Sequence, residues 1–412
     1  MAEVVVMVTT SYPRFPGDSV GTFMEPIAVS VAARGHQVHV VAPWHPLVAR
    51  APVERGVHFH FYRYAPVRAL NVFGYAAALR ADVSLRGAAY VAAPLALTAG
   101  WLSAWRVARR YRATVMHGHW VIPGGFTALA ASPRRPQVVS LHGSDVYLAE
   151  TFAPARRAAR MVFERAGAVT ACSTDLARRA IALGADPATI EVVPYGVDAG
   201  RFRPQPERRA AIRAALGVAD DALLGFTAGR LVRKKGFEHL IDAWARVETS
   251  PPAVLAIAGD GDLRDELRER ARAAGVADRV KFLGNLSQDD VGAHLGAADV
   301  VVIPSIRDDS GNVDGLPNIV LEALSAGAPV VATTAGGIGT VVDHERTGLV
   351  VPERRPDAIA EAVQRLAGDP ALRSSLGEAA RRMVETRFGW GHTAERFEAA
   401  YRRAVANKAG GR

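Results

Sequence analysis

A strand, a basic loop and a helix follow one another in Leu223-Leu-Gly-Phe-Thr-Ala-Gly-Arg-Leu-Val-Arg-Lys-Lys-Gly-Phe-Glu-His-Leu-Ile-Asp-Ala-Trp-Ala-Arg-Val247. The apolar run Leu223–Ala228 predicts a buried strand, and Phe237–Val247 predicts the helix after it. Arg230 stands at the end of the strand and Lys235 in the loop before the helix. Ligands of α/β folds bind beyond the carboxyl ends of strands. The stretch therefore predicts an α/β fold with cations placed to bind an anion.

Strand-like runs alternate with helix-like runs on both sides of this stretch. Before it, apolar runs predict strands at Val4–Thr9, Val38–Ala42, Val115–His117, Val138–Leu141, Ala168–Ala171 and Ile190–Val193. After it, they predict strands at Val254–Ala258, Val280–Leu283, Val300–Ile303, Val330–Ala332 and Leu349–Val351. Helices are expected at Phe23–Ala33, Ala155–Ala166, Leu263–Ala274, Gln288–Ala297, Ile319–Ala326, Asp357–Leu366, Ala371–Val384 and Thr393–Val405. This alternation predicts parallel sheets with helices on both faces.

The chain of 412 residues is too long for one compact core, so we expect two Rossmann-like domains in tandem. An Arg- and Pro-rich stretch that ends at Pro206 is the expected linker, with an N-terminal domain at 1–198 and a C-terminal domain at 199–389. The composition, 49% hydrophobic and 22% charged, is that of a globular protein. The single cysteine, Cys172, excludes an internal disulfide and fits a reducing cytosol.

A second informative stretch is Asp314-Gly-Leu-Pro-Asn-Ile-Val-Leu-Glu322. Its two carboxylates are eight residues apart, so they would face nearly the same way on a helix, about two turns from each other. Pro317 favours a helix start at this point. The amides of Asn318, Ile319 and Val320 would then point out of the helix and attract phosphate.

The net charge of +9 belongs almost entirely to the first half of the chain, where residues 1–198 hold 20 Arg against 12 acidic residues. Two arginine clusters stand out, at Arg106, Arg109, Arg110 and Arg112 and at Arg156, Arg157, Arg160 and Arg165. Such a face attracts anionic lipid or an anionic acceptor, and a plain solvated surface is the alternative. Nucleic acid is not expected, because no nucleic-acid motif accompanies the charge.

Gly87–Trp105 is a run of nineteen uncharged residues. Its length would span a bilayer, but its many alanines make it weakly hydrophobic, so a buried or surface-lying segment is expected instead. Trp101 and Trp105, next to the first arginine cluster, resemble an interfacial anchor. The amino terminus lacks a basic leader segment, so we expect a cytoplasmic protein. The basic first half adds the expectation that it binds peripherally to the inner face of the cell membrane.

Several weaker motifs follow strands in the first half. Gly21 and Thr22 precede a helix, where a glycine lets backbone approach a ligand, although the loop does not match the dinucleotide fingerprint G-x-G-x-x-G. His119 and His142 each follow a strand. No third ligand accompanies them, so metal binding is not expected, and His142 is a candidate hydrogen-bond partner for a sugar or phosphate. A structural hydrogen bond is the alternative for this residue.

Two further loops occur in the second half. Asp260-Gly261-Asp262 looks like a D-x-D metal motif, but Asp262 is better placed to cap the next helix. The loop Thr333–Thr340 is small and rich in glycine, so its amides would close over a ligand or form a plain turn.

Together these residues resemble family 4 of the retaining glycosyltransferases, a GT-B group that uses nucleotide sugars. The resemblance covers almost the whole chain and rests on Gly21-Thr22-Phe23, His117-Gly-His119-Trp120, His142-Gly-Ser-Asp145, Pro194-Tyr-Gly-Val-Asp198, Gly229-Arg230-Leu231, Lys234-Lys235-Gly236, Gly259-Asp260-Gly261, Phe282-Leu283-Gly284 and Asp314–Ala323. It implies two Rossmann-like domains that face across a cleft, with a last helix at about 390–407 that packs back on the N-terminal domain. Asp314 departs from the Glu of many members, and Gly339-Thr340 from their Pro-Glu.

The resemblance also assigns roles to individual residues. Catalytic roles fall to Arg230 and Lys235, which would neutralise the diphosphate, to Asp314, which would contact the donor hexose, and to His142, near the reacting sugar. Residues implied in substrate binding are Gly21, Thr22, His119, Gly261, Gly315, Leu316, Asn318, Ile319 and Glu322, the last through the ribose hydroxyls. No metal and no cofactor are expected, because fixed cations would stabilise the leaving group.

The expected activity is transfer of a hexosyl unit, with retained configuration, from a nucleoside diphosphate sugar to a glycan, a lipid-linked acceptor or a small molecule. Cell-envelope or exopolysaccharide synthesis is the expected setting. Because no second carboxylate is placed to act as a nucleophile, a front-face substitution is the working hypothesis. The alternatives are a non-catalytic sugar-nucleotide-binding protein and a GT-B epimerase. A phosphorylase would need a Schiff-base lysine, and none is well supported.

Overall fold

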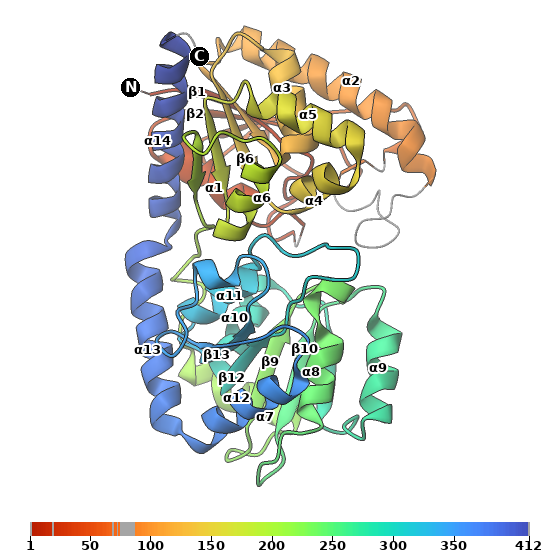
Figure 1. Cartoon of the computed structure of the whole chain (residues 1–412), viewed down its shortest axis with the longest axis vertical. Coiled ribbons are helices and arrows are strands. Elements are labelled where there is room, and N and C mark those ends of the chain that lie inside the picture. The colour runs from red at the N-terminus through yellow and green to blue at the C-terminus, as the bar shows by residue number, and fades with distance from the viewer. Residues whose placement is uncertain (1, 19, 68–69, 72, 75–86, 411–412) are drawn as a thin grey trace. The chain divides into compact units, whose positions relative to one another are not determined.

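The computed structural model describes residues 2–18, 20–67, 70–71, 73–74 and 87–410 (Figure 1). Contacts divide the chain into two compact units. The first comprises Met1–Tyr195 together with Trp390–Arg412, and the second comprises Gly196–Gly389. Each unit is built around its own sheet, and we refer to them as the N-terminal and C-terminal domains.

The N-terminal domain has an eight-stranded sheet in the order β3-β4-β2-β1-β5-β6-β7-β8. All of its neighbouring strands are parallel except β3, which runs antiparallel to β4. Its strands are β1 (Val4–Val8), β2 (Gln37–Pro43), β3 (Val53–Glu54), β4 (Val57–Tyr62), β5 (Val115–His119), β6 (Gln137–Leu141), β7 (Ala168–Ala171) and β8 (Ile190–Val192). The six strands predicted in this half are confirmed.

Strands β3 and β4 have no counterpart among the predicted strands. In β4, His58 and His60 alternate with Phe59 and Phe61, so no apolar run marks the strand. Its pairing with β2, in register from Val38 to Pro43, fixes its position. A strand of half-polar composition is thus defined by its neighbour rather than by its own hydrophobicity.

The helices of this domain are α1 (Met24–Ala33), α2 (Gly87–Arg110), α3 (Phe126–Ala131), α4 (Ser144–Thr151), α5 (Ala153–Phe163), α6 (Thr174–Ala182) and α14 (Trp390–Ala409), with a π-helical turn η2 (Trp120–Gly125). The long α14 packs beside α1 and across β7 (Figure 1). Its buried face includes Phe397, Ala400, Tyr401 and Ala404. Gly167 has no side chain where Ala404 approaches, because a Cβ there would lie 2.7 Å from the Ala404 Cα.

The C-terminal domain has a six-stranded parallel sheet in the order β11-β10-β9-β12-β13-β14. Its strands are β9 (Leu224–Ala228), β10 (Val254–Ala258), β11 (Val280–Gly284), β12 (Val300–Ile303), β13 (Val330–Thr333) and β14 (Leu349–Val351). Its helices are α7 (Pro206–Leu216), α8 (Phe237–Trp244), α9 (Arg264–Ala273), α10 (Gln288–Ala297), α11 (Asn318–Ser325), α12 (Pro356–Gly368) and α13 (Pro370–Arg387), with short 3₁₀ turns η3 (Arg233–Lys235) and η4 (Ile338–Thr340). Every strand predicted in this half is confirmed.

The first strand of the C-terminal domain, β9, lies in the middle of its sheet. The chain adds β10 and β11 on one side of β9 and then crosses to β12, β13 and β14 on the other side. The order therefore reverses between β9 and β12, and such a switch point opens a crevice at the carboxyl ends of the two strands. Trp244 of α8 is fully buried against Gly225 of β9, where a Cβ would collide with the indole ring.

Helix α2 contains the uncharged run that begins at Gly87. None of the helices in the described part of the chain combines the length and the hydropathy that crossing a membrane requires. On α2, the side chains of Leu95, Leu97, Trp101 and Trp105 are between 38% and 45% exposed. Of the two expected alternatives, a buried and a surface-lying segment, the structure shows the second, a helix with an apolar outer face.

Candidate active site

The loop after β9 and the segment before α11 meet through an ion pair. Lys235 Nζ lies 2.6 Å from Asp314 Oδ2, and Lys234 Nζ lies 3.4 Å from Asp314 Oδ1. All three side chains are at least four-fifths buried. The two residues singled out in the sequence, Lys235 and Asp314, are therefore in contact, and Lys234 joins them although it was not a predicted site residue.

Two glycines explain why these segments come so close. Gly236 adopts a left-handed φ of +66°, and a Cβ there would collide with the Pro304 carbonyl after β12. Gly336, in the glycine-rich loop after β13, has a φ of +55°, and a Cβ there would collide with the Asp314 carbonyl. Side chains at either position would push the backbone apart. The Thr333–Thr340 loop thus packs against the backbone of Asp314.

The lysines decide the charge of Asp314. Burial opposes ionisation of this carboxyl, yet the positive charges of Lys235, Lys234 and Arg230 hold its pKa well below the usual range. Asp314 is therefore a carboxylate at neutral pH. Arg230 lies at the end of β9 and is exposed, where its charge still reaches Asp314.

Glu322 is a partly buried residue of α11. Burial raises its pKa to about 7, although Lys235 and Arg201 act in the opposite direction. Around pH 7 this carboxyl is therefore divided between its neutral and charged forms. Asp314 and Glu322, eight residues apart in sequence, thus have opposite pKa shifts in one domain.

The start of α11 differs in one detail from the expectation. Pro317 is the residue before the helix, and the Val320 N–H donates to its carbonyl at 3.1 Å, so this amide is already used. Asn318 and Ile319 are the first two residues of the helix. Gly315 and Leu316 are buried immediately before it.

Gly261 lies in the loop between β10 and α9. A Cβ there would collide with the Leu231 carbonyl, so this glycine lets the loops after β9 and β10 pack together. The expectation that Asp262 caps the next helix is wrong, because α9 begins at Arg264 and no side chain caps it. Asp260 instead accepts a hydrogen bond from the Gly261 N–H at 2.9 Å and pairs with Arg264 at 3.4 Å.

In the N-terminal domain, the expected histidines form a connected row. His119 ends β5 and His142 follows β6, and His119 Nδ1 lies 3.2 Å from His142 Nε2. His142 Nδ1 lies 2.8 Å from the Tyr195 hydroxyl. Both ring nitrogens of His142 therefore have partners, so a ligand would have to replace one of these bonds.

Aromatic rings surround His142. Phe23 lies 4.9 Å from its ring centroid and 4.8 Å from that of Tyr195, while Trp120 lies 4.6 Å from His142. Trp120 has a φ of +63°, which is unusual for a residue with a side chain and often marks a functional site. Phe23, Trp120 and Tyr195 were not predicted as site residues, although each stands inside a motif that carries the family resemblance.

Burial keeps this histidine row neutral. It lowers the pKa of His119 to about 3 and the pKa of His142 well below its ordinary value. His117, which contacts the Tyr401 hydroxyl at 2.9 Å and Ser140 Oγ at 2.7 Å, is shifted in the same direction. At neutral pH these side chains therefore act as hydrogen-bonding groups without charge.

A buried carboxyl holds the two histidine loops together. Asp145 accepts hydrogen bonds from the N–H groups of Val121 at 2.7 Å, Gly143 at 2.9 Å and His142 at 3.2 Å. Val121 belongs to the loop after His119, while the other two belong to the loop after β6. Asp145 therefore positions His142 without being available to a ligand itself.

Gly21 and Thr22 lie at the start of α1. Gly21 has a φ of +64°, and its carbonyl accepts a hydrogen bond from the Met24 N–H at 2.9 Å. A Cβ there would lie 3.2 Å from Ser11 Oγ, so the loop after β1 folds tightly. Thr22 lies between this turn and Phe23. The ring of Phe23 contacts His142 and so connects this loop to the histidine.

The predicted site residues therefore form two groups, each at the carboxyl ends of central strands of its own sheet. The C-terminal domain brings together Arg230, Lys235, Asp314 and Glu322 with the start of α11. The N-terminal domain brings together His119 and His142, and Phe23, which follows Gly21 and Thr22 in the chain, contacts His142. Across the described residues, no cluster of three or more His, Cys, Asp or Glu side chains is arranged to hold a metal ion.

Sequence profiles of two glycosyltransferase groups match this chain. The profile of Glycosyltransferase Family 4 matches residues 20–201, and that of Glycosyl transferases group 1 matches residues 208–383. The two matches correspond to the two groups of site residues.

Among curated relatives, a D-inositol 3-phosphate glycosyltransferase of Kineococcus radiotolerans is 34% identical over 76% of this chain and 77% of its own length. A GDP-mannose-dependent alpha-(1-6)-phosphatidylinositol monomannoside mannosyltransferase of Mycobacterium tuberculosis is also 34% identical, over 61% of this chain. The match spans 66% of the length of that mannosyltransferase, slightly under two thirds.

Solved structures show the same architecture. Sucrose-phosphate synthase from Thermosynechococcus elongatus is similar over 98% of this chain and 100% of its own, with a TM-score of 0.79 and 20% identity. HepE of Anabaena, solved with UDP, is similar over 96% of this chain and 98% of its own, with a TM-score of 0.76 and 20% identity. At this identity the likeness concerns the GT-B fold alone.

Proposed function

This chain belongs to glycosyltransferase family 4, and on that premise we propose that it transfers a hexosyl unit from a nucleoside diphosphate sugar, with retained configuration and without a metal. The observation that carries the proposal is the contact of Lys234 and Lys235 with Asp314 at the switch point of the C-terminal sheet. Cations held there in a mostly buried loop suit a diphosphate.

The proposed chemistry depends on the leaving group. Breaking the bond from the anomeric carbon to the phosphate oxygen leaves extra negative charge on the nucleoside diphosphate. Lys235 and Arg230 stabilise that charge, and they do so most strongly in the transition state. The departing phosphate oxygen takes the proton of the acceptor hydroxyl as the new glycosidic bond forms on the same face. Preorganised cations supply the charge that a metal supplies in other enzymes.

Asp314 has a defined part in this scheme. In the absence of donor its carboxylate balances Lys234 and Lys235. When the diphosphate binds, the lysines gain a second anionic partner, and Asp314 becomes free to accept hydrogen bonds from the hexose. Glu322, whose pKa is about 7, completes the proposed donor site by accepting from the ribose hydroxyls.

For the N-terminal domain we propose an acceptor-binding role in which His142 contributes as a neutral imidazole. Its low pKa excludes a cationic role at neutral pH. The ring would exchange its bond to Tyr195 or His119 for one to a sugar hydroxyl. The stacked rings of Phe23 and Trp120 would hold it in place during that exchange.

The relatives suggest the donor and acceptor to test first. Their names specify GDP-mannose as a donor and inositol phosphate or phosphatidylinositol mannoside as acceptors. We propose a nucleoside diphosphate hexose as donor, with GDP-mannose as the first candidate, and an acceptor that carries a phosphorylated polyol, free or lipid-linked. Cell-envelope glycan synthesis is the setting in which such an acceptor would be used.

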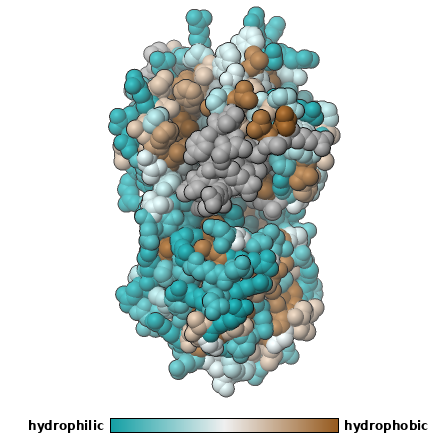
Figure 2. Space-filling model, turned by 90° about the vertical axis from the view of Figure 1, so that its right-hand side faces the viewer, coloured by the Kyte–Doolittle hydropathy of each residue, from teal (hydrophilic) through white to brown (hydrophobic). Residues whose placement is uncertain are grey.

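Peripheral binding to an anionic membrane is part of the proposal. Helix α2 contains no acidic residue, and its exposed tryptophans, Trp101 and Trp105, precede the exposed Arg106 and Arg109. Figure 2 looks onto the side where α2 lies in Figure 1, and apolar groups are visible there on the N-terminal domain. Apolar side chains flanked by arginines suit the interface of an anionic bilayer.

A donor screen tests the central claim. Thermal shift and hydrolysis are measured with UDP-, GDP- and ADP-sugars, each in the presence of a chelator. Stabilisation by at least one nucleotide sugar without added metal is expected. If none binds, the assignment is wrong. If one binds and is only isomerised at the sugar, the chain is an epimerase, and if one binds without any turnover on the acceptors tested, it is a non-catalytic binding protein.

The membrane proposal has its own test. Co-sedimentation with vesicles that contain an anionic phospholipid should be strong at low salt and weaken as salt is raised, because the arginines contribute through charge. Replacement of Trp101 and Trp105 together by Ala should weaken the remaining high-salt binding. Equal sedimentation with neutral and anionic vesicles would count against the proposal.

A further inference from the structure

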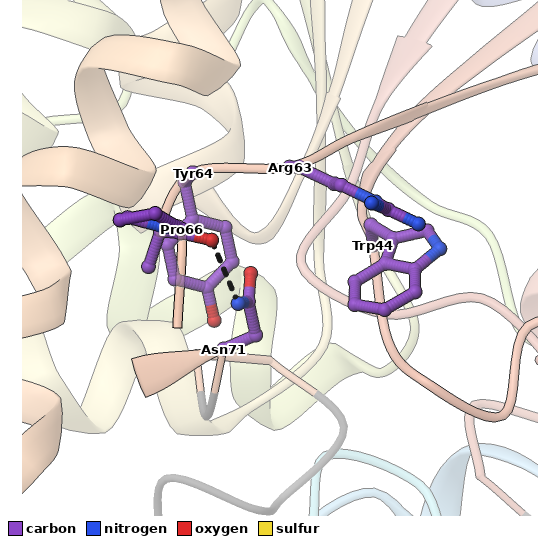
Figure 3. A pocket seen from close by; sticks show the side chains of 6 residues that line it. Trp44, Arg63, Tyr64, Pro66 and Asn71 are labelled. Atoms are coloured by element: carbon purple, nitrogen blue, oxygen red, sulfur yellow. Dashed lines mark hydrogen bonds between the residues drawn. The ribbon is translucent and has the colours of Figure 1, made fainter. Parts of the chain in front are cut away.

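A separate pocket lies at the edge of the N-terminal sheet, at the carboxyl ends of β2 and β4. It has a volume of about 390 Å³ and is lined by Trp44, Arg63, Tyr64, Ala65, Pro66 and Asn71 (Figure 3). None of these residues belongs to the site described above. The volume is within the range of small-molecule sites.

Strand register places the first two of these residues side by side. Pro43 of β2 pairs with Tyr62 of β4, so the next residues, Trp44 and Arg63, leave adjacent strands together. The Trp44 N–H donates to the Tyr62 carbonyl at 2.8 Å. The Arg63 guanidinium carbon then lies 4.1 Å from the centre of the Trp44 ring.

This stacking prepares Arg63 to bind an anion. A guanidinium that lies over an indole uses its flat face for the ring, while its N–H groups, in the guanidinium plane, stay available at the edge. Within the described part of the chain, no carboxylate pairs with Arg63 and none lines the pocket. A phosphate would find a fixed pair of donors there.

Asn71 adds a hydrogen-bond acceptor to the donors of Arg63. Its Nδ2 donates to the carbonyls of Ala65 and Val67, each at 3.0 Å, and these two bonds fix which way the carboxamide points. The remaining atom, Oδ1, is buried and has no partner among the described residues. Asn71 as a whole is only 5% exposed. An unpaired buried acceptor destabilises the folded protein, and a ligand hydroxyl that donates to it would remove that cost.

The two groups together define a ligand class. Arg63 suits an anion, Asn71 Oδ1 suits a hydroxyl donor, and the apolar Ala65 and Pro66, which also line the pocket, suit the carbon skeleton of a ring. A simple anion satisfies only the first, and an uncharged sugar only the second. A phosphorylated polyol ring satisfies both.

We propose that this pocket binds the phosphorylated ring of a cyclitol or sugar phosphate, with Arg63 on the phosphate and Asn71 Oδ1 on a ring hydroxyl. The inference deepens the proposed function and rests on it for one point, that this ring belongs to the acceptor whose reacting hydroxyl meets His142. The phosphate is either free or the headgroup of a lipid, and the pocket itself contacts the same chemistry in both cases.

Calorimetric titration of the full chain without donor tests the pocket directly. The probes are inositol 1-phosphate, inositol, inorganic phosphate and a short-chain phosphatidylinositol below its micelle concentration. Inositol 1-phosphate should bind at least about ten-fold more tightly than inorganic phosphate, and inositol more weakly than either phosphorylated ring. A preference for the lipid identifies a headgroup, and a preference for the free compound identifies a soluble ligand. Both support the site.

Variants assign the binding to this pocket. Arg63→Gln should weaken inositol 1-phosphate binding by about ten-fold or more, and Arg63→Lys should recover only part, because an ammonium group offers no planar fork. Arg346→Gln, at an exposed arginine of the other domain, is the matched control and should change nothing. Equal affinity for phosphate and the phosphorylated ring, or unchanged affinity in Arg63→Gln, would overturn the inference.

Donor binding, measured in parallel, separates the two claims. If a nucleotide sugar binds but inositol 1-phosphate does not, the pocket inference fails while the proposed function stands. If inositol 1-phosphate binds in an Arg63-dependent way but no nucleotide sugar does, the pocket stands and the proposed function fails.

Discussion

The two domains share one architecture but place different chemistry at the carboxyl ends of their central strands. In the C-terminal domain, Lys234 and Lys235 enclose the ionised Asp314. In the N-terminal domain, the carboxyl ends of β5 and β6 hold His119 and His142, which burial keeps neutral. One site is built from charges and the other from uncharged hydrogen-bonding groups and rings.

The difference follows from what each site would stabilise. A diphosphate carries charge before and after the reaction, so fixed cations suit the C-terminal site. A sugar hydroxyl both donates and accepts, and a neutral imidazole, with one donor and one acceptor nitrogen, suits it in either role. In this repeated fold the strands stay alike, and the loops that follow them give each domain its own chemistry.

The largest effect is expected at Lys235. Lys235→Ala should lower turnover about 100-fold to 1,000-fold with the fold intact, because a cation on the leaving group is lost. Steady-state kinetics together with a circular dichroism spectrum checks this. Lys408→Ala, at an exposed lysine of α14, serves as the control. Near-normal turnover of Lys235→Ala would show that Lys235 does not stabilise the leaving group.

Glu322→Gln should stabilise the protein and weaken donor binding at the same time. The raised pKa means that the ionised carboxyl destabilises the folded state, with no penalty below about pH 4.5 and the full penalty above about pH 7. The variant should therefore gain about 2–3 kcal/mol of unfolding free energy at pH 8 and almost nothing at pH 4.5. Denaturant titrations at both pH values measure this. An equal gain at the two values would contradict the raised pKa.

Tyr195→Phe tests the hydrogen bond to the neutral His142 in the N-terminal domain. The substitution removes the hydroxyl that lies 2.8 Å from His142 Nδ1 and keeps the stacked ring. Loss of one neutral hydrogen bond is worth about 1 kcal/mol, so turnover should fall by up to about ten-fold, with the dissociation constant of the donor unchanged. Tyr147→Phe on α4 is the matched control. A weakened donor affinity would mean that Tyr195 acts on the donor.

The smallest effect is expected from a second group of histidines in the N-terminal domain. His39 Nδ1 lies 3.0 Å from His60 Nε2, and burial together with neighbouring positive charge lowers the pKa of both to about 4. Their contribution to stability is complete above about pH 6.5 and is lost as the pH falls toward 4. His60→Gln should reduce this acid-induced loss by about 1 kcal/mol in denaturant titrations.

His392→Gln, at an exposed histidine, is the control for that measurement and should leave the acid-induced loss as it is. An unchanged loss in His60→Gln would show that the paired histidines are not what makes the N-terminal domain sensitive to acid.

Much of the fold could be predicted, because parallel strands buried on both faces are continuous apolar runs. The strands from Val254–Ala258 to Leu349–Val351 follow directly from that rule. β4 could not be predicted in the same way, since its alternating histidines are only partly buried and find their partners on the neighbouring strand β2.

The candidate site divides along the same line. Lys235, Asp314 and Glu322 could be named because Lys235 follows a predicted strand, the two carboxylates are eight residues apart at a predicted helix start, and all three stand in motifs that carry the family resemblance. Phe23, Trp120 and Tyr195 could not, because an aromatic residue in a loop carries no signal of the imidazole that it will face.

Local sequence patterns were enough to predict the two α/β domains, the strand ends that carry the functional side chains and the sign of the charge in each loop. These depend on local apolar periodicity and residue type. The folded domains are needed to see which carboxyl is ionised, which histidines are neutral and that Trp44 contacts Arg63. Protonation and stacking depend on burial and on partners far away along the chain, and these come into existence only when the sheets have formed.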